Sequence, residues 1–289
     1  MKRCLRCKTK FDGLKWSCPQ CGYQPSRVGN HLSFAPNLAE NGDTYEADFF
    51  AQLFELEAKN FWFRSRNQLL IWILKSTFAS AQSFLEVGCG TGFVLSEVER
   101  SLPHLTSVGA ELFATGLNFA SHRLSKAELL QMDARFIPYD DQFDVVGAFD
   151  VLEHIPEDTV VLSEMYRSIT PGGGLILTVP QHPWLWSHAD TYAHHVRRYT
   201  ATELRLKVEN AGFQIIRMTS FMSFLLPLMF LSRLRQRQSK AEYDPIAELK
   251  ISGWLNTAFE IVLNLERMII RSGLSLPFGG SLLLVAKKL

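Results

Sequence analysis

The sequence has few cysteines, almost no net charge and no long apolar run. Only 5 of its 289 residues are cysteine, and 30 basic side chains nearly balance 29 acidic ones, for a net charge of +1. Such a balance gives no overall attraction to nucleic acid or to an anionic membrane. No stretch reaches the roughly 20 apolar residues that span a bilayer, and the first residues, MKRCLRCKTKF, lack the apolar core of a signal peptide. We therefore expect a cytoplasmic protein.

Four of the five cysteines form two Cys-x-x-Cys pairs near the N-terminus. Ten residues separate Cys4 and Cys7 from Cys18 and Cys21. This spacing presents four thiolates to one tetrahedral Zn²⁺, whereas two disulfides fit poorly with a chain that shows no export signal. Residues 1–28 are therefore predicted to form a zinc ribbon. Its metal is expected to be structural, because protein fills all four ligand positions.

A glycine-rich turn follows the first strong strand signal. The apolar run 84–87 ends in Gly-Cys-Gly-Thr-Gly at 88–92, and a helical pattern follows. Glycine suits a turn whose backbone conformation disfavours a Cβ and which a ligand approaches closely. Cys89 lies inside this turn without a basic neighbour in the sequence, so it is predicted to be a packing residue rather than a nucleophile.

Strand and helix patterns alternate from this turn onward. The predicted strands are residues 83–87, 106–111, 128–131, 143–149, 174–179, 214–221 and 281–287. Helical stretches between the early ones predict a mainly parallel sheet covered on both faces, a doubly wound α/β fold. Residues 29–43 are predicted to be a linker, residues 44–80 to form N-terminal helices, and residues 222–275 to form a helical insertion.

Acidic residues follow three of the predicted strands. Glu111 ends the second strand, Asp133 follows the third and Asp150 ends the fourth. An acid at the position of Glu111, nineteen residues after Gly92, can accept hydrogen bonds from ribose hydroxyls in a βαβ nucleotide fold. Because the carboxyl ends of parallel strands meet at one edge of a sheet, we expect these acids and the glycine turn to surround one ligand.

The segment from residue 84 to about residue 221 resembles a class I S-adenosylmethionine-dependent methyltransferase of the broad ubiquinone-biosynthesis-like group. The matching motifs are residues 86–92, Glu111, Met132-Asp133-Ala134, residues 143–154 and Pro171-Gly172-Gly173. The resemblance implies a Rossmann-like sheet of seven strands whose last strand, residues 281–287, is antiparallel. It assigns residues 44–289 to the methyltransferase domain and names S-adenosylmethionine as the cofactor.

The resemblance also implies a role for each motif residue. Glu86 and the glycines would lie along the methionine part of the cofactor, Glu111 would hold the ribose, and Asp133 would face the adenine. Asp150 would lie near the methionine amino group. Arg66 is added to this set because its guanidinium can form two hydrogen bonds to a carboxylate. The predicted cofactor-binding residues are Glu86, Gly88, Cys89, Gly90, Gly92, Glu111, Leu112, Asp133, Ala134, Asp150 and Arg66.

A loop rich in histidine, tryptophan and arginine follows the fifth predicted strand. We expect residues 180–199 to form the pocket for the methyl acceptor, and the alternative is a structural loop satisfied by its own hydrogen bonds. A histidine with a near-neutral pKa can take a proton from a hydroxyl acceptor. The candidate catalytic residues are therefore His154, His182 and His195.

The sequence lacks the signatures of several acceptor classes. No Asn-Pro-Pro-Tyr or Asp-Pro-Pro-Tyr follows the fourth strand, and no Pro-Cys pair occurs, so the motifs of amino-methylating nucleic-acid enzymes and of cytosine C5 methylation are missing. O-methylation of a small-molecule, carbohydrate or lipid-linked acceptor is predicted. The alternatives are an RNA or protein methyltransferase that uses the basic ribbon for recognition, an NAD-dependent oxidoreductase, whose G-x-G-x-x-G fingerprint this turn does not match, and a non-catalytic cofactor-binding protein.

An apolar segment and an amphipathic helix lie within the insertion. Residues 221–231 are strongly apolar and are followed by Arg233, Arg235, Arg237 and Lys240. The segment is too short to span a membrane and suits a lid or an interfacial helix, so residues 221–240 are a candidate for peripheral membrane contact. The next helix carries a polar stripe on otherwise apolar faces, which predicts burial against the domain or in a homodimer. The stripe consists of Asn256, Glu260, Asn264, Arg267 and Arg271.

Overall fold

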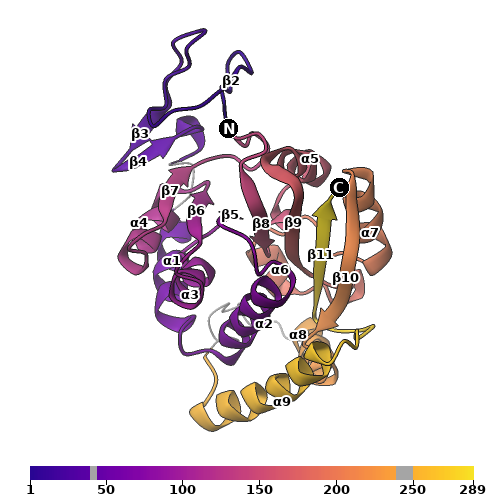
Figure 1. Cartoon of the computed structure of the whole chain (residues 1–289). Coiled ribbons are helices and arrows are strands. Elements are labelled where there is room, and N and C mark those ends of the chain that lie inside the picture. The colour runs from indigo at the N-terminus through magenta and orange to yellow at the C-terminus, as the bar shows by residue number, and fades with distance from the viewer. Residues whose placement is uncertain (40–43, 239–249) are drawn as a thin grey trace.

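The structure, a computed structural model, describes residues 1–39, 44–238 and 250–289. Residues 40–43 of the expected linker and residues 239–249 of the insertion, including Lys240, lie outside the described residues. In the described part, one sheet has the strand order β10-β11-β9-β8-β5-β6-β7-β4-β3 (Figure 1). Its strands are β3 (Ser26–Val28), β4 (His31–Ser33), β5 (Ser83–Val87), β6 (Thr106–Glu111), β7 (Glu128–Gln131), β8 (Phe143–Phe149), β9 (Ile169–Pro180), β10 (Phe213–Phe221) and β11 (Ser281–Lys288).

The predicted doubly wound sheet is confirmed. Strands β5 to β9 pair in parallel, and β11 lies antiparallel between β9 and β10, as expected for the last strand. Along β5, Phe84 belongs to one apolar cluster, while Leu85 and Val87 belong to another. Successive side chains of β5 therefore point to opposite faces of the sheet, and both faces are buried, as in proteins that carry helices on both sides.

A hairpin extends the sheet beyond the seven expected strands. Strands β3 and β4 form the hairpin, and β4 pairs in parallel with β7 through Leu32 with Leu130 and Ser33 with Gln131. Residues 31–33 of the segment expected to be a linker therefore form β4, which lies between β7 and the edge strand β3. A strand of three residues is too short to show an alternating pattern in the sequence. It forms because its backbone groups pair with those that β7 would otherwise leave unpaired at the edge of the sheet.

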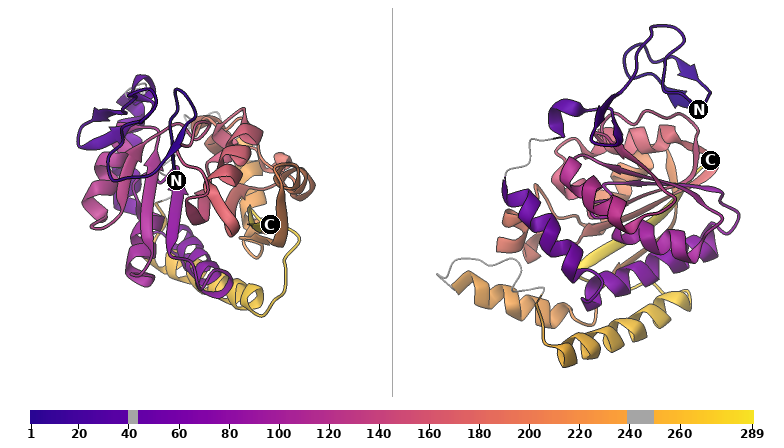
Figure 2. Two further views of the ribbon diagram at one scale, coloured as in Figure 1. Left: turned by 45° about the horizontal axis from the view of Figure 1, so that its top comes forward. Right: turned by 90° about the vertical axis from the view of Figure 1, so that its left-hand side faces the viewer.

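Helices cover both faces of the sheet (Figure 2). The α-helices are α1 (Thr44–Leu56), α2 (Phe61–Thr77), α3 (Phe93–Ser101), α4 (Ala114–Arg123), α5 (Asp158–Ser168), α6 (His188–Tyr192), α7 (Ala201–Asn210), α8 (Leu226–Gln238) and α9 (Gly253–Arg271), with short 3-10 turns η1 (Pro36–Leu38), η2 (Leu152–His154) and η3 (Pro183–Leu185). Thr200 caps the N-terminus of α7, because its hydroxyl accepts from the Glu203 N–H. No helix of the described residues has the length and apolarity needed to cross a membrane.

The N-terminal segment docks on the end of the sheet opposite α8 and α9 (Figure 2). It contains a two-stranded sheet of β1 (Lys2–Arg3) and β2 (Lys10–Phe11). The Trp16 ring packs edge-on against Phe34 and Tyr139, with ring centroids 4.6 and 5.4 Å apart. The fully buried Asp140 carboxylate pairs with Arg3 and Lys10. Aromatic packing and buried ion pairs therefore hold this segment on the domain.

Helix α9 turns its polar stripe toward α2. Asn256 accepts from the Phe61 N–H at 2.8 Å, and Glu260 forms a two-bond ion pair with Arg64. These contacts place Asn256 and Glu260 of the stripe against α2, whereas Arg271 at the end of the helix is exposed.

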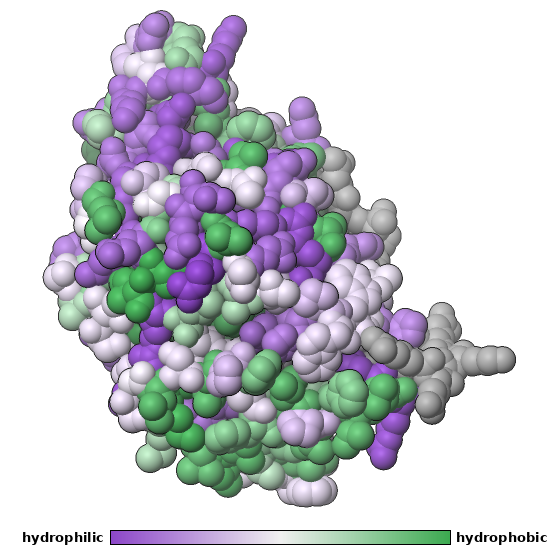
Figure 3. Space-filling model, turned by 90° about the vertical axis from the view of Figure 1, so that its right-hand side faces the viewer, coloured by the Kyte–Doolittle hydropathy of each residue, from purple (hydrophilic) through white to green (hydrophobic). Residues whose placement is uncertain are grey.

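The opposite side of α9 is apolar and exposed. Trp254, Ile261, Leu265 and Met268 keep 73, 56, 53 and 65% of their surface accessible. Apolar side chains gather at the bottom of Figure 3, over the region of α8 and α9. We call the exposed apolar residues of these two helices the α8–α9 face, and they are Leu228, Phe230, Leu231, Leu234, Trp254, Ile261, Leu265 and Met268.

Candidate functional site

The glycine turn joins β5 to α3. Gly88, Gly90 and Gly92 have φ values of 70°, 53° and 76°, in the left-handed region that glycine adopts without steric cost. A Cβ on Gly88 would lie 2.5 Å from a methyl group of Val151, which precedes η2. The turn therefore needs glycine at this position for space as well as for conformation. Cys89 is buried, and burial raises the pKa of its thiol, so the side chain is a packing group.

Glu111 lies beside the turn at the end of β6. Its Oε2 accepts from the Gly90 N–H at 2.9 Å, and its Oε1 accepts from the N–H groups of Leu112 and Phe113 at 2.8 and 3.1 Å. Backbone donors thus fix the carboxylate at the carboxyl edge of the sheet. The structure brings Glu111 and Leu112 next to the glycine turn, which ends nineteen residues before Glu111 in the sequence.

Three other predicted residues meet next to the turn. Asp150 follows β8 with a φ of 59° and pairs with Arg66 of α2. The Arg66 guanidinium lies 4.5 Å from the centroid of the Trp62 ring. Glu86 is buried, its Oε2 has no hydrogen-bond partner, and burial raises its pKa while Arg66 opposes that rise. Arg66 therefore supplies the positive charge between two acids from different strands.

Asp133 follows β7 and forms a local ion pair. Its carboxylate binds Arg135, with Nη2 to Oδ2 at 2.8 Å, and accepts from the Arg135 backbone N–H at 2.9 Å. Asp133 also lines a cavity of about 260 Å³ together with Leu5, Phe34 and Leu38. The N-terminal segment thus forms part of the wall next to this acid. Ala134 is buried beside it.

Helix α1 covers the turn, a contribution that sequence reasoning missed. A Cβ on Gly116 would lie 3.1 Å from the Phe50 ring. Glu57 pairs with Arg123 at 2.5 Å and accepts from the Thr91 hydroxyl at 2.5 Å. The ion pair and the hydrogen bond tie the end of α1 to the turn. No sequence pattern links Glu57 to an arginine 66 positions later.

Two of the three candidate catalytic histidines lie together. The rings of His154 and His195 are 4.7 Å apart between centroids and nearly perpendicular. His154 is exposed by its accessible surface, but desolvation by the surrounding loop and the neighbouring His195 ring lower its pKa. His182 lies elsewhere in the loop, where its ring stacks on Trp184 at 4.9 Å and on Phe278 at 5.9 Å.

A buried aspartate orients His195. The Nδ1 of His195 lies 2.9 Å from Asp190 Oδ1, which also accepts from Arg198 Nε at 2.7 Å. The second oxygen of Asp190 accepts from the Ser187 N–H at 2.8 Å. Burial acts to raise the pKa of Asp190, but the hydrogen bond from His195 and the charge of Arg198 hold it well below its usual value. An ionised Asp190 thus fixes the His195 ring.

Glu153 lies against the two histidines without a hydrogen bond of its own. It is completely buried, and neither carboxylate oxygen has a partner. Its Oε1 lies 3.9 Å from His195 Nε2. Burial and then the charge of Asp150 raise the pKa of Glu153 well above its usual value. Neither Glu153 nor Asp190 is among the predicted site residues, because the role of a carboxylate in a loop depends on how that loop closes.

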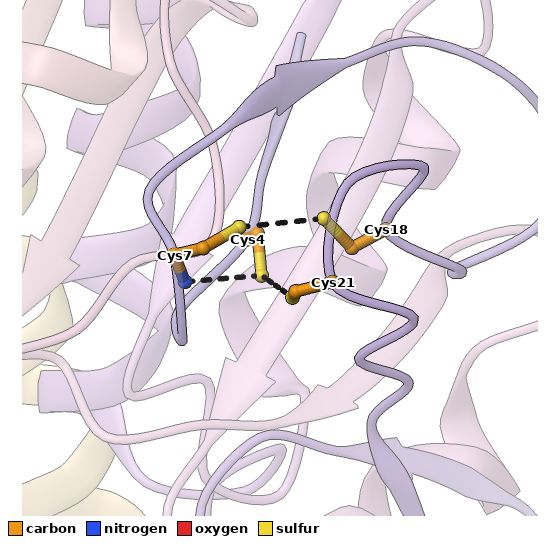
Figure 4. A group of neighbouring side chains, drawn as sticks. All are labelled: Cys4, Cys7, Cys18 and Cys21. Carbon is orange, nitrogen blue, oxygen red and sulfur yellow. Dashed lines mark hydrogen bonds between the residues drawn. The ribbon is translucent and has the colours of Figure 1, made fainter.

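The four N-terminal cysteines converge (Figure 4). The Sγ atoms of Cys4 and Cys21 are 3.6 Å apart and those of Cys7 and Cys18 are 3.5 Å apart, and all four lie within 4.8 Å of one another. Four sulfurs at about 2.3 Å from a tetrahedral Zn²⁺ would be separated by roughly 3.8 Å. The donor set and its spacing therefore fit that ion.

Comparison with known proteins places this chain in a family. Residues 47–218 match the family described as methyltransferase domain. A probable S-adenosylmethionine-dependent methyltransferase of Mycolicibacterium smegmatis is 27% identical over 55% of this chain and 62% of its own length. A fatty-acid O-methyltransferase of the same organism is 34% identical over 39% of this chain and 43% of its own length. A ubiquinone biosynthesis O-methyltransferase of Pseudomonas putida is 32% identical over 39% of this chain and 50% of its own length.

The matches to these relatives thus span from under half to just over three fifths of their lengths. Among solved structures, the [4+2]-cyclase SpnF superposes with a TM-score of 0.52 at 21% identity, over 78% of this chain and 80% of its own. That similarity concerns the fold. Because the family match covers well over half of the sequence, from α1 to β10, the chain belongs to the methyltransferase domain family.

Proposed function

We propose that this protein transfers a methyl group from S-adenosylmethionine to an oxygen of a small-molecule, carbohydrate or lipid-linked acceptor. The observation that carries the proposal is the adjacency of two clusters at the carboxyl ends of the strands. Glu111, Glu86 and Asp150 surround the glycine turn, and the loop after Asp150 leads directly into Glu153 and His154. The first cluster suits a nucleotide-like donor, and the second suits activation of a hydroxyl.

The donor would lie across the glycine turn. Glu111 would accept from the ribose hydroxyls, and Asp133 with Ala134 would border the adenine in the cavity that Phe34 and Leu38 also line. Asp150 would face the positively charged methionine amino group, and Arg66 its carboxylate. Glu86 and the backbone of residues 88–92 would follow the methionine chain. These assignments use acids and one arginine that already lie at a single edge of the sheet.

The acceptor oxygen would lie beside His154 and His195. Methyl transfer is an in-line displacement, in which the oxygen attacks the methyl carbon as the carbon–sulfur bond breaks, so alignment and removal of the hydroxyl proton are the main demands. The ordered pair Asp190 and His195 supplies a fixed imidazole. His182, stacked between Trp184 and Phe278, would line the acceptor pocket instead of moving a proton.

The α8–α9 face favours a lipid-linked acceptor at an anionic bilayer surface. Its exposed charges on the described helices are basic, at Arg235 and Arg271. The two acids of α9 point inward, because Glu260 pairs with Arg64 and Glu266 accepts from the N–H groups of Ser223 and Phe224. An exposed apolar stripe with only basic charges beside it is the pattern of a helix that lies in a membrane interface. A homodimer would cover the same face, and the oligomeric state tests that alternative.

The N-terminal segment is proposed to be a structural zinc ribbon over residues 1–28. Three of its basic residues serve the fold: Lys2 donates to backbone carbonyls of the segment, including that of Gly13 at 2.5 Å, while Arg3 and Lys10 pair with Asp140. These contacts reduce the charge available for an RNA phosphate backbone. Recognition of RNA or protein by the ribbon is therefore the second candidate function. The position of the ribbon beside the Asp133 cavity supports it.

Methyl labelling of cell extract tests the function. The full chain is incubated with S-adenosylmethionine that carries a tritiated methyl group, and the extract is separated into lipid, carbohydrate, small-molecule, RNA and protein fractions. Label is expected in the lipid fraction or in another non-polymeric fraction, on oxygen. Label confined to RNA or protein would overturn the acceptor class, and label in no fraction would favour a non-catalytic binding protein. The variant Glu111→Ala controls for donor binding.

A further inference from the structure

We propose that the N-terminal ribbon is part of the donor site, where Leu5, the residue after Cys4, forms a wall of the pocket for the adenine base. This inference rests on the proposed function, because it takes the cavity beside Asp133 as the place of the base. It assigns the ribbon to the methyl donor instead of to an RNA or protein acceptor. The cavity lining, the packing of the ribbon and a buried hydrogen-bond bridge carry it.

The lining of the cavity comes from three separate segments. Leu5 belongs to the ribbon, Phe34 and Leu38 belong to the segment after β4, and Asp133 and Phe136 follow β7. A mostly apolar lining with one carboxylate suits a planar base that carries an exocyclic amine. Because the ribbon supplies one of the apolar walls, loss of Leu5 from its place would open this pocket to water.

Ring packing fixes the ribbon on that lining. Leu5 and Trp16 are both half-buried and pack against the main apolar cluster of the domain. The Trp16 ring lies edge-on to the Phe34 ring, 4.6 Å away between centroids, and Phe34 itself lines the cavity. The ribbon therefore contributes twice to the pocket, directly through Leu5 and indirectly by supporting Phe34.

The backbone around Leu5 depends on the cysteine cluster. Cys4 immediately precedes Leu5, and its N–H donates to the Thr9 carbonyl at 2.9 Å within the first cysteine knuckle. On the other side of Cys4, the Arg3 N–H donates to the Pro138 carbonyl at 2.9 Å and so joins the knuckle to the domain. A knuckle of this size has too little core to hold its shape without metal. The position of Leu5 is therefore tied to zinc binding.

A buried amide links the same lining to the ribose site. Gln131, at the end of β7, is completely buried. Its Oε1 accepts from the Ser33 hydroxyl at 2.7 Å and from the Ala35 N–H at 3.1 Å. Its Nε2 donates to the carbonyls of Ala35 and Leu112 at 2.9 and 2.8 Å. Since Leu112 follows Glu111, one side chain joins the segment under the ribbon to the backbone of the proposed ribose site.

These connections require a reciprocal effect between zinc and donor. If the folded ribbon closes the base pocket, zinc binding raises the affinity for S-adenosylmethionine. Bound S-adenosylmethionine must then raise the affinity for zinc by the same factor, because coupling between two binding sites is symmetric. A ribbon that serves only an acceptor or only the stability of the chain gives no such effect of the donor on zinc.

Filling the pocket from the ribbon side tests the role of Leu5. S-adenosylmethionine is titrated by calorimetry into the zinc-loaded full chain and into Leu5→Trp. The larger side chain occupies space that the base needs, so at least tenfold weaker binding is expected, with one zinc per chain retained. The matched control is Leu14→Trp in the same ribbon, where Leu14 is fully exposed. It should bind S-adenosylmethionine as the wild type does.

Zinc affinity of the wild type gives the second measurement. It is determined by competition with a chelator, with and without saturating S-adenosylmethionine, and is expected to be at least tenfold higher with the donor. If Leu5→Trp loses its zinc, this measurement decides the inference without any variant.

The outcomes separate the inference from the proposed function. Wild-type donor affinity in a zinc-loaded Leu5→Trp, or a zinc affinity that the donor does not change, overturns the role of the ribbon and leaves the proposed function standing. A wild type that binds no S-adenosylmethionine contradicts the proposed function itself, and the inference is overturned with it.

Discussion

At the scale of single residues, the glycine turn depends on space as much as on backbone freedom. Gly88 and Gly172 both have positive φ, 70° and 78°, yet a Cβ on Gly172 would meet nothing within 4 Å, whereas one on Gly88 would lie 2.5 Å from Val151. Substituting alanine at Gly88 and at Gly172 therefore separates the cost of the left-handed backbone from the cost of the steric clash. Val151 directly follows Asp150, so the steric cost falls on the proposed donor site.

Gly88→Ala is expected to weaken S-adenosylmethionine binding at least tenfold, because Val151 and with it Asp150 must move. Gly172→Ala should leave the affinity unchanged and lower the free energy of unfolding by about 1–2 kcal/mol through its left-handed backbone alone. Calorimetric titration and urea unfolding of both variants check this. Wild-type affinity in Gly88→Ala would contradict the placement of the donor at the turn.

A second residue-scale prediction concerns the buried Asp158 at the start of α5. It accepts from the Tyr199 hydroxyl at 2.7 Å and from Lys207 at 2.6 Å, and it pairs with Arg197. Burial acts to raise its pKa, but Lys207, Tyr199 and Arg197 together hold the pKa below the usual value of 3.8. The stability that this carboxylate contributes is therefore fully present above pH 3.8 and is lost as the pH falls through its folded-state pKa.

Asp158→Asn is expected to lower the free energy of unfolding by about 2 kcal/mol at pH 7, because it leaves the half-buried Arg197 and Lys207 without their charged partner. The difference from the wild type should be smaller at pH 3, because the stability that the carboxylate contributes is lost as the pH falls below 3.8 toward its lowered pKa. Urea unfolding at both pH values measures it. An equal difference at the two pH values would show that the charge of Asp158 is not what stabilises the loop.

The strand pattern of the sequence predicted that the proposed donor residues meet at one edge of the sheet, but it did not predict which residues surround His195. Glu111, Asp133 and Asp150 each follow a strand, so the strand pattern alone brings them to one edge of the sheet. Glu153 and Asp190 meet His195 only because the loop after β9 folds back, with Gln181 paired to Tyr199. A loop closure of this kind leaves no periodic signal in the sequence.

At the scale of elements, α1 packs over the glycine turn of the proposed donor site. The contacts of its C-terminal end include those of Glu57 with Arg123 and Thr91, and the Arg123 guanidinium 4.1 Å from the Phe54 ring. Helices were predicted over residues 44–80, and α1 occupies residues 44–56 of that range. The register of the helix on the turn was not predictable, because it depends on an ion pair between segments distant in sequence.

Arg123→Met is expected to weaken S-adenosylmethionine binding about fivefold by loosening α1, a loss of roughly 1 kcal/mol. Hydrogen exchange of residues 49–56 should become faster at the same time. The control Arg100→Met removes an arginine whose side chain is 73% exposed and paired only with Glu97 in the described structure. Unchanged exchange and affinity in Arg123→Met would exclude a covering role for α1.

The N-terminal segment gives a metal-removal prediction. Cys21→Ser is expected to lose one zinc per chain and to lower the melting temperature, because the ribbon has too little core to fold without metal and its Trp16 packs on Phe34 and Tyr139. Zinc analysis and thermal unfolding measure both effects. Full zinc content in Cys21→Ser would contradict a four-cysteine site.

At the scale of the whole molecule, the ribbon and the α8–α9 face lie at opposite ends (Figure 2). The apolar faces of α9 were expected to be buried against the domain or in a homodimer. In the structure, polar residues of the stripe contact α2, and one apolar side of the helix is exposed. The sequence does not say which side of α9 meets the domain. Leu265 and Leu206 are both 53% exposed, on α9 and α7 respectively, and so form a matched pair for testing the face.

Vesicle flotation tests the membrane assignment. The wild type is expected to float with vesicles that contain anionic lipid and not with purely zwitterionic ones, because both apolar insertion and basic charge contribute. Leu265→Glu should abolish flotation, and Leu206→Glu should not. Sedimentation of the same proteins gives the oligomeric state: a dimer that Leu265→Glu dissociates, together with no vesicle binding, would show that a second copy covers the face.

The most direct test of the central claim is calorimetric binding of S-adenosylmethionine to the full chain. We predict one molecule bound per chain, at least tenfold weaker binding in Glu111→Ala, and no binding of NAD under the same conditions. Binding of NAD in place of S-adenosylmethionine, or unchanged affinity in Glu111→Ala, would contradict the assignment of the glycine turn and its surrounding acids as the donor site.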